Sequence, residues 1–217
     1  MRVLIIGAGG HGQVVADILL RMSERTVAVE PIGFLDDNPA LSGRQVLGLP
    51  VLGTTAAFAS VAHDAFIVAI GDNATRRRIT EPLLRSGERL ATAQHPDAVI
   101  ARDVSIGPGT TVCAGAVVNP GSVVGSCVLL NTGCSIDHHN LIGDYAHVAP
   151  GVRLGGQVVV GEGALVGIGA MVTPRLCIGA WCVVGAGSLV HHDVPSGVMV
   201  VGNPARVLDG PAEKDEM

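Results

Sequence analysis

The sequence is poor in charge, in aromatic rings and in lysine. Only 15% of its 217 residues are charged and 2% are aromatic, and the sole lysine is Lys214 in a polar tail. The net charge of −5 disfavours nucleic-acid binding, because tracking phosphates requires a basic surface. A catalytic Schiff base on a buried lysine is excluded. Disorder is disfavoured by a hydrophobic content of 48%, and the core must be built from Val, Ile, Leu and Ala.

Long uninterrupted apolar runs are also missing. The uncharged stretch 104–136 is broken every few residues by Gly, Pro or Asn, whereas a membrane-spanning helix needs about 20 consecutive apolar residues. The apolar run at 3–6 is too short for a secretory signal. The five cysteines form no CxxC pair, which favours reduced thiols. We therefore expect a cytoplasmic protein without a membrane partner.

The first ninety or so residues alternate short apolar runs with helical patterns. Strands are predicted at 3–6, 32–35 and 65–70, and the spacing of apolar residues predicts a helix over 13–22. A second helix is predicted after Asn73. Strands separated by helices form a parallel sheet, and there is room for about one mononucleotide-binding half. We therefore expect a small Rossmann-like α/β domain over 1–95.

The second half of the chain has a period of six. From Ile100 to Val190, every sixth residue is Ile, Leu or Val, sixteen in a row. Such a repeat is typical of a parallel β-helix, in which three hexads form one triangular coil. Gly follows the aliphatic in eight hexads, and the fourth residue after it is usually small, which we interpret as allowing tight bends. We expect an all-β parallel β-helix over 96–208, about five coils long, and a flexible tail over 209–217.

One polar segment interrupts this regular array. Asp137, His138 and His139 follow the core residue Ile136 in a stretch poor in titratable groups. An imidazole exchanges protons near neutral pH and a carboxylate can orient it, so we interpret the cluster as a general base; a solvated surface and a metal site are the alternatives. His147 lies half a coil after His138, so the two should face different sides of the prism. If both serve one site, they come from neighbouring subunits.

A glycine-rich turn follows the first predicted strand. The pattern GxGxxG runs from Gly7 to Gly12, and Asp36 follows 24 residues later, which nearly matches a dinucleotide-binding fingerprint. Glycines let the backbone approach a phosphate at a helix N-terminus. NAD would need a second mononucleotide half, for which the chain has no room. For Asp36 and Asp37, a plain turn before Pro39 is the alternative.

Taken together, these motifs resemble those of the bacterial hexapeptide-repeat sugar acetyltransferases that carry an N-terminal nucleotide-sugar-binding domain. That family includes UDP-4-amino-sugar and GDP-perosamine N-acetyltransferases and sialic-acid O-acetyltransferase-like proteins. The resemblance spans nearly the whole chain and is carried by His147 and by segments 7–12, 34–37, 69–73, 131–138 and 201–206. It implies a left-handed β-helix, a homotrimer with sites between subunits, acetyl-CoA as co-substrate and no metal.

The resemblance also implies roles for single residues. His138 would be the general base in direct transfer from acetyl-CoA, oriented by Asp137 or by His139, where several relatives have Glu. Asn131 would at most position the site. The implied contacts are His147, Ile168 and Ala186 for acetyl-CoA, and Gly9, Gly10, His11, Asp36, Asp37 and Gly71 for the nucleotide sugar.

Other functions stay open at this point. A sialic-acid-type O-acetyltransferase would differ in its acceptor, and a non-catalytic trimeric scaffold would need no base. A zinc carbonic anhydrase would gather three imidazoles from positions 138, 139, 147, 191 and 192. We expect N-acetylation of a 4-amino group on a nucleotide-linked sugar, in glycan biosynthesis. We expect His191 and His192 on the surface, and Arg175 and Arg206 as candidate contacts of coenzyme A phosphates.

Overall fold

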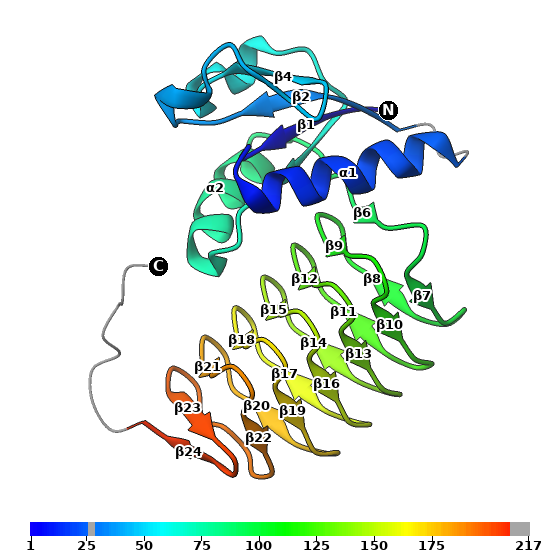
Figure 1. The fold of residues 1–217 in the computed structure, drawn as a ribbon, viewed down its shortest axis with the longest axis vertical. Helices are drawn as coiled ribbons and strands as arrows, with labels where there is room; N and C mark the ends of the chain where they lie inside the picture. Colours follow the sequence, from blue (N-terminus) through cyan, green and yellow to red (C-terminus); the bar gives the residue numbers. More distant parts are fainter. Residues whose placement is uncertain (26–28, 209–217) are drawn as a thin grey trace.

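A computed structural model describes residues 1–25 and 29–208 of the chain. The tail expected over 209–217, which includes Lys214, lies outside these residues. An N-terminal α/β domain stands on one end of a tall prism of short strands (Figure 1). None of the helices in the described ranges is both long enough and apolar enough to cross a membrane.

The N-terminal domain is a five-stranded sheet with the strand order β3-β4-β2-β1-β5. Its elements are β1 (Arg2–Ile6), α1 (Gly10–Glu24), β2 (Glu30–Leu35), η1 (Pro39–Leu41), β3 (Gln45–Val46), β4 (Leu49–Gly53), η2 (Thr55–Ser60), β5 (Ala65–Val68) and α2 (Asn73–Arg85). All neighbouring strands are parallel except β3 and β4, which form an antiparallel hairpin. The predicted parallel sheet is confirmed, whereas the hairpin was not predicted.

The prism is a left-handed parallel β-helix with three sheets as its sides. One side holds β7 (Val99–Ile100), β10 (Val117–Val118), β13 (Ser135–Ile136), β16 (Arg153–Leu154), β19 (Met171–Val172) and β22 (Leu189–Val190). A second side holds β8 (Ser105–Ile106), β11 (Val123–Val124), β14 (Leu141–Ile142), β17 (Val159–Val160) and β20 (Cys177–Ile178). The third, eight-stranded side holds β6 (Ala93–Gln94), β9 (Thr111–Val112), β12 (Leu129–Leu130), β15 (His147–Val148), β18 (Leu165–Val166), β21 (Val183–Val184), β23 (Met199–Gly202) and β24 (Ala205–Val207).

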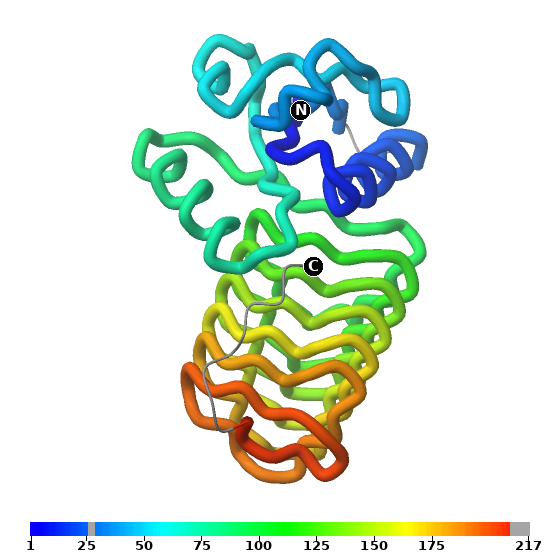
Figure 2. The backbone as a smooth tube through the Cα atoms, turned by 60° about the vertical axis from the view of Figure 1, so that its left-hand side comes forward, coloured from blue at the N-terminus to red at the C-terminus, as the bar shows by residue number. Residues whose placement is uncertain are grey.

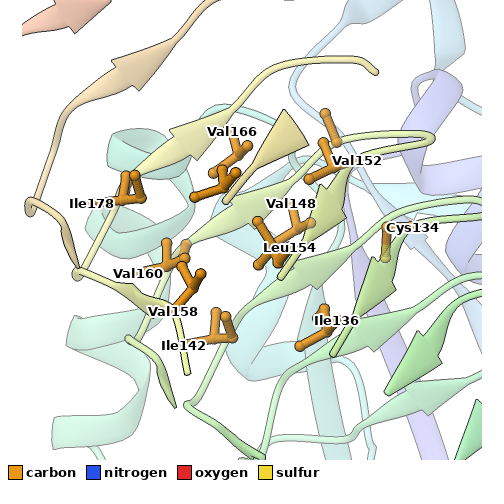
Figure 3. Close-up of a cluster of buried hydrophobic side chains, with 14 of the residues drawn as sticks. Cys134, Ile136, Ile142, Val148, Val152, Leu154, Val158, Val160, Val166 and Ile178 are labelled. Atoms are coloured by element: carbon orange, nitrogen blue, oxygen red, sulfur yellow. The ribbon is translucent and has the colours of Figure 1, made fainter. Parts of the chain in front are cut away.

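The predicted ladder of aliphatic side chains fills the prism. Of the sixteen residues, fourteen are buried, and Ile100 and Ile106 are half-buried against the same core. Figure 3 shows part of this core, with Ile136, Val148 and Leu154 converging from different strands. Strands 18 residues apart pair in register, for example Ile136 with Leu154. The six-residue period therefore predicted both the interior and the strand positions.

The interpretation of the small residues as bend-formers is wrong. Ala116, Cys134 and Ala146 are fully buried, so these side chains fill space inside the prism beside the aliphatics. Positive φ angles instead recur three residues after every aliphatic from Ile106 to Val184, for example at Gly121 (73°) and His139 (58°). The glycine that follows an aliphatic serves close coil-to-coil contact, because a Cβ at Gly161 would lie 2.5 Å from the Ala180 nitrogen.

The N-terminal domain is joined to the prism by α1, α2 and β6. Strand β6 already pairs with β9, so the first strand of the eight-stranded side precedes the expected boundary at 96, which stays a prediction. Helix α1 packs its apolar face, including Val15 and Leu19, against Ala93 of β6 and Cys113. Figure 2 shows the coils stacked in one column, with the N-terminal domain at one end and the β23–β24 hairpin at the other.

Candidate functional site

A cleft of about 430 Å³ opens at the carboxyl ends of β1, β2 and β5. This is the edge where parallel sheets of this type bind ligands. The turn after β1 packs tightly against α1, because a Cβ at Gly12 would collide with the carbonyl oxygen of Gly7. All six residues expected to bind a nucleotide sugar line this cleft: Gly9, Gly10, His11, Asp36, Asp37 and Gly71.

The two carboxylates of the cleft also shape its wall. Asp36 accepts hydrogen bonds from the backbone nitrogens of Ala8, at 2.7 Å, and Asn38, at 2.8 Å. Asp37 accepts from the backbone nitrogen and the hydroxyl of Thr55, at 2.8 and 2.9 Å. Asp36 and Asp37 thus stabilise the local backbone, as the alternative of a plain turn predicts. These contacts do not exclude ligand binding, because both residues also face the cleft.

His11 is held as a neutral imidazole at the floor of the cleft. Burial, followed by the positive charge of Arg76, lowers its pKa to about 4. Its Nε2 atom is buried without a hydrogen-bond partner among the described residues. A neutral, unpartnered ring nitrogen beside a cleft can bind a polar group of a ligand without a charge penalty.

His147 lies on β15 close to His11. Burial, then the charges of Arg76 and His11, lower its pKa to about 4, although a hydrogen bond with the Gly71 backbone acts in the opposite direction. Its Nε2 lies 3.2 Å from the side-chain amide nitrogen of Asn131. The Asn131 Oδ1 accepts from the Thr132 nitrogen, so the amide nitrogen donates to Nε2 and the neutral ring carries its proton on Nδ1.

The sheets show where His138 and His147 lie relative to each other. His147 lies on the eight-stranded side, whereas His138 follows β13 on the six-stranded side. The prediction that they face different sides of the prism within one chain is confirmed. Asn131 contacts His147. Within one chain, Asn131 therefore belongs with the cleft-side histidine and not with the bend that contains His138.

The bend at 137–139 presents an exposed pair of imidazoles. The Nδ1 atoms of His138 and His139 lie 3.0 Å apart, and the rings meet edge to face at 80°. The His138 ring lies over Gly156 of the next coil, where a Cβ would come within 2.6 Å of it. Asp137 instead accepts a hydrogen bond from the His138 backbone nitrogen, at 2.8 Å. The group in contact with the His138 ring is thus His139, whereas the Asp137 carboxylate bonds to the backbone.

Asn140 supports this bend from inside the prism, a role that the sequence did not reveal. It is fully buried, and its amide nitrogen donates to the carbonyl oxygens of Asp137, at 2.7 Å, and Gly155, at 3.0 Å. Its Oδ1 has no hydrogen-bond partner among the described residues. The one signal in the sequence was that Asn140 is the fourth residue after the aliphatic Ile136, a position that is usually occupied by a small residue.

The other expected contact residues lie further along the prism. Ile168 and Ala186 occupy exposed bends of consecutive coils after β18 and β21, and Ile168 is 62% exposed. Arg175 is exposed and contacts Gln157. At the far end, His191, His192 and Arg206 line a second cleft of about 410 Å³. His192 is exposed and His191 is half-buried. This second cleft is remote from the bend at 137–139 along the chain of coils.

A metal centre finds no support in these positions. Among residues 1–25 and 29–208, no group of three or more His, Cys, Asp or Glu side chains could hold a metal ion. The five histidines considered for zinc lie in three separate places: His138 with His139, His147 alone, and His191 with His192.

Comparisons with known proteins agree with this arrangement. The PglD N-terminal domain family matches residues 2–83. The chain is 32% identical over 212 residues to GDP-perosamine N-acetyltransferase of Escherichia coli, and the match covers 94% of this chain and 95% of that protein.

Two solved structures are similar over almost their whole length. The acetyltransferase domain of PglB from Neisseria gonorrhoeae, in complex with acetyl coenzyme A, has 38% identity and a TM-score of 0.87, covering 95% of this chain and 98% of that one. PerB from Caulobacter crescentus, in complex with CoA and GDP-perosamine, has 37% identity and a TM-score of 0.87, covering 96% and 97%.

Proposed function

Because the chain belongs to the family of the GDP-perosamine N-acetyltransferases, we propose that it transfers the acetyl group of acetyl-CoA to the 4-amino group of a nucleotide-linked sugar. The observation that carries the proposal is the cleft that gathers Gly9, Gly10, His11, Asp36, Asp37 and Gly71 at the carboxyl edge of the sheet. PerB, which is similar over nearly all of its length, holds CoA and GDP-perosamine together. The nucleotide base is left to experiment.

We assign the donor to the eight-stranded side of the prism. His147, Ile168 and Ala186 all belong to coils on this side, and the last two present exposed bends one above the other. Coenzyme A would lie along these bends and contact mainly backbone. Burial lowers the pKa of His147 to about 4, which makes it a weak base, and its Nε2 accepts from the Asn131 amide, so we assign it the role of a fixed hydrogen-bonding group. Asn131 positions it.

In the proposed reaction, His138 is the general base. The sugar amine attacks the thioester carbon, a C–N bond forms, and His138 accepts the proton released from nitrogen at Nε2. The tetrahedral intermediate collapses, the C–S bond breaks, and His138 returns that proton to the leaving thiolate. Backbone N–H groups would stabilise the oxyanion. The products are an N-acetylated sugar and free CoA.

His139 orients the base in this proposal. For Nε2 of His138 to accept a proton, its Nδ1 must carry one, and the Nδ1 of His139 at 3.0 Å can accept that hydrogen bond. Asp137 acts on the backbone of the same bend. The orienting role that several relatives give to Glu would thus fall to an imidazole here.

A homotrimer would complete the site. His147, whose ring is hydrogen-bonded to Gly71 of the cleft, lies on a different side of the prism from His138. One subunit would therefore supply the cleft and its neighbour the base. This arrangement accounts for the exposure of the imidazole pair in the single chain. The five free cysteines are consistent with a reducing, cytoplasmic location.

The direct test is acetyl-CoA turnover against a panel of UDP- and GDP-linked 4-amino sugars. We expect CoA to be released with one of the amino sugars. Mass spectrometry should then detect the N-acetylated form of that sugar. Free sialic acid serves as the O-acceptor control. Turnover with sialic acid alone would replace the proposal by O-acetylation, and no turnover with any acceptor would favour the scaffold.

A further inference from the structure

Arg76 is the largest fully buried side chain of the protein among the described residues. It lies in the first turn of α2, followed by the more exposed Arg77 and Arg78. A guanidinium group has five N–H donors in a rigid planar arrangement. Burying its charge is costly unless each donor finds an acceptor.

The structure supplies one acceptor for each donor. Nε donates to the Cys127 carbonyl at 2.9 Å, and Nη2 donates to the Tyr145 carbonyl at 2.7 Å and to the Asn73 side chain at 2.9 Å. Nη1 donates to the carbonyls of Ile70, at 2.9 Å, and Gly71, at 3.2 Å. All five acceptors are neutral oxygens. The Asp72 carboxylate adds an attraction at longer range.

The acceptors on the prism belong to one column of bends. Cys127 and Tyr145 are 18 residues apart and both have positive φ angles, 55° and 59°. The next bend in the column contains Gly163, whose carbonyl accepts a hydrogen bond from the Asn73 amide at 3.0 Å. Arg76 and Asn73 thus attach the start of α2 to three consecutive coils.

The acceptors on the other side belong to the cleft. Ile70 and Gly71 line the cleft opposite Asp36. Gly71 accepts from Arg76 and also hydrogen-bonds through its backbone to the His147 ring. Arg76, Gly71 and His147 therefore form one connected set, which joins the wall of the cleft to the side of the prism that we assign to the donor.

We propose that Arg76 is a positioning residue for acetyl transfer, which holds the Ile70–Gly71 wall of the nucleotide-sugar cleft in register with His147 on the β-helix. The proposal rests on the proposed function for its catalytic consequence. It does not need that function for its structural claim. Arg76 itself touches neither cleft nor solvent, so it acts through Gly71.

A lysine cannot replace this arginine. An ammonium group keeps the charge, but it offers three donors from a single atom and cannot reach five acceptors spread over two domains. The charge of Arg76 also contributes to the low pKa of His11 and of His147. Arg76→Lys therefore keeps the positive charge and removes most of the hydrogen bonds between the two domains, so it separates the effect of the charge from the effect of the contacts.

The test compares Arg76→Lys with Arg85→Lys, an exposed arginine at the end of the same helix. In Arg76→Lys we expect amide hydrogen exchange in segment 69–73 to increase at least tenfold. We expect the Kd for the UDP or GDP probe that the wild type binds, and the KM for the amino sugar, to rise roughly tenfold. A 1 Å displacement near a reacting group can cost a hundredfold in rate. Arg85→Lys should behave as wild type.

The KM separates positioning from simple loss of folded protein, because misfolding lowers the apparent kcat without changing KM. If Arg76→Lys does not fold, Asn73→Ala serves instead, since it removes one Arg76 acceptor and the Gly163 contact. Unchanged exchange at 69–73 and unchanged probe affinity in a folded variant would overturn the proposal. If the wild type neither binds the probes nor transfers acetyl groups, the proposed function fails, while the exchange comparison still decides the role of Arg76.

Discussion

The two histidine pairs of this protein lie in opposite environments. His11 and His147 are at the junction of the α/β domain and the prism, where burial lowers the pKa of each to about 4. His138 and His139 are exposed on a bend of the six-stranded side and contact each other. The same side chain is therefore held neutral by burial in one region and exposed to solvent in the other.

This difference follows from what surrounds each pair. The junction is covered by two domains and contains the charge of Arg76, so protonation of either imidazole there is unfavourable. The bend at 137–139 packs only against the neighbouring coils, where Gly121 lies beside the His139 ring and Gly156 beside the His138 ring, and its backbone is held by Asp137 and Asn140. We infer that the junction binds and orients substrates while the bend moves the proton.

The largest expected effect comes from removing the proposed base. His138→Asn should lower kcat roughly 10²–10⁴-fold, the usual contribution of a general base, because the amide cannot accept the amine proton. The measurement is steady-state release of CoA thiol. His192→Asn, at an exposed position, is the matched control and should retain wild-type turnover. Near wild-type kcat in His138→Asn would refute the assignment of the base.

A second prediction separates a shared site from one built by a single chain. His138→Asn and His11→Asn should each be nearly inactive alone. After mixed refolding or co-expression, about a quarter of the sites would combine a normal cleft with a normal bend from the neighbouring subunit, so about a quarter of the activity should return. Activity that stays at the level of the single variants would show that the two regions do not meet between subunits.

A third prediction concerns stability against pH. Because the folded pKa of His147 is about 4, below the ordinary histidine value of 6.5, the unfolded chain binds more protons as the pH falls from 6.5 to 4. The free energy of unfolding should then decrease by about 3 kcal/mol through this residue, and stay level above pH 6.5. His147→Gln should remove that part of the slope.

Urea unfolding at pH 7, 6, 5 and 4 measures this difference. His192→Gln, on the surface, is the control and should keep the wild-type slope. Parallel curves for wild type and His147→Gln would mean that the junction does not hold this imidazole neutral. We expect the free energy of unfolding of His147→Gln to depend less steeply on pH than that of the wild type, and only between pH 4 and 6.5.

The smallest expected effect concerns the support of the exposed bend. Asn140→Ala leaves the carbonyls of Asp137 and Gly155 without a donor and should cost about 1–3 kcal/mol of unfolding free energy. It should also lower kcat several-fold, because the His138 backbone is less constrained. Ser188→Ala, another buried polar residue of the prism, should reduce stability alone. Equal kcat values for the two variants would contradict the role of Asn140.

The prism was predictable because its period is independent of distant contacts. Each hexad places one aliphatic inside, and neighbouring coils repeat the same contact, so local pattern and tertiary structure coincide. The hairpin of β3 and β4 was missed because its turn, Leu47–Gly48, lacks the usual Asn-Gly signal although both residues have positive φ angles.

Arg76 and Asn140 were missed for a related reason. Three consecutive arginines on a predicted helix do not reveal which one is buried, since the face that docks on the prism carries the polar residues Asn73, Arg76 and Thr80. Burial predictions follow apolar periodicity, and this face has none. Its partners are backbone carbonyls of bends, which have no side-chain signature.

By itself, the sequence determined the parallel sheet, the six-residue ladder, the glycine turn with its two aspartates, and the histidine cluster after Ile136. These features depend on residues that are near one another in the chain or repeat at a constant interval. Only the tertiary structure decided that His147 lies half-buried close to His11, that Arg76 and Asn73 join the cleft to three coils, and that His139 contacts His138. Those outcomes depend on how the two parts of the chain pack and how the bend is shaped, because burial and hydrogen-bond partners across 50 to 90 residues are set by the packing of the domains.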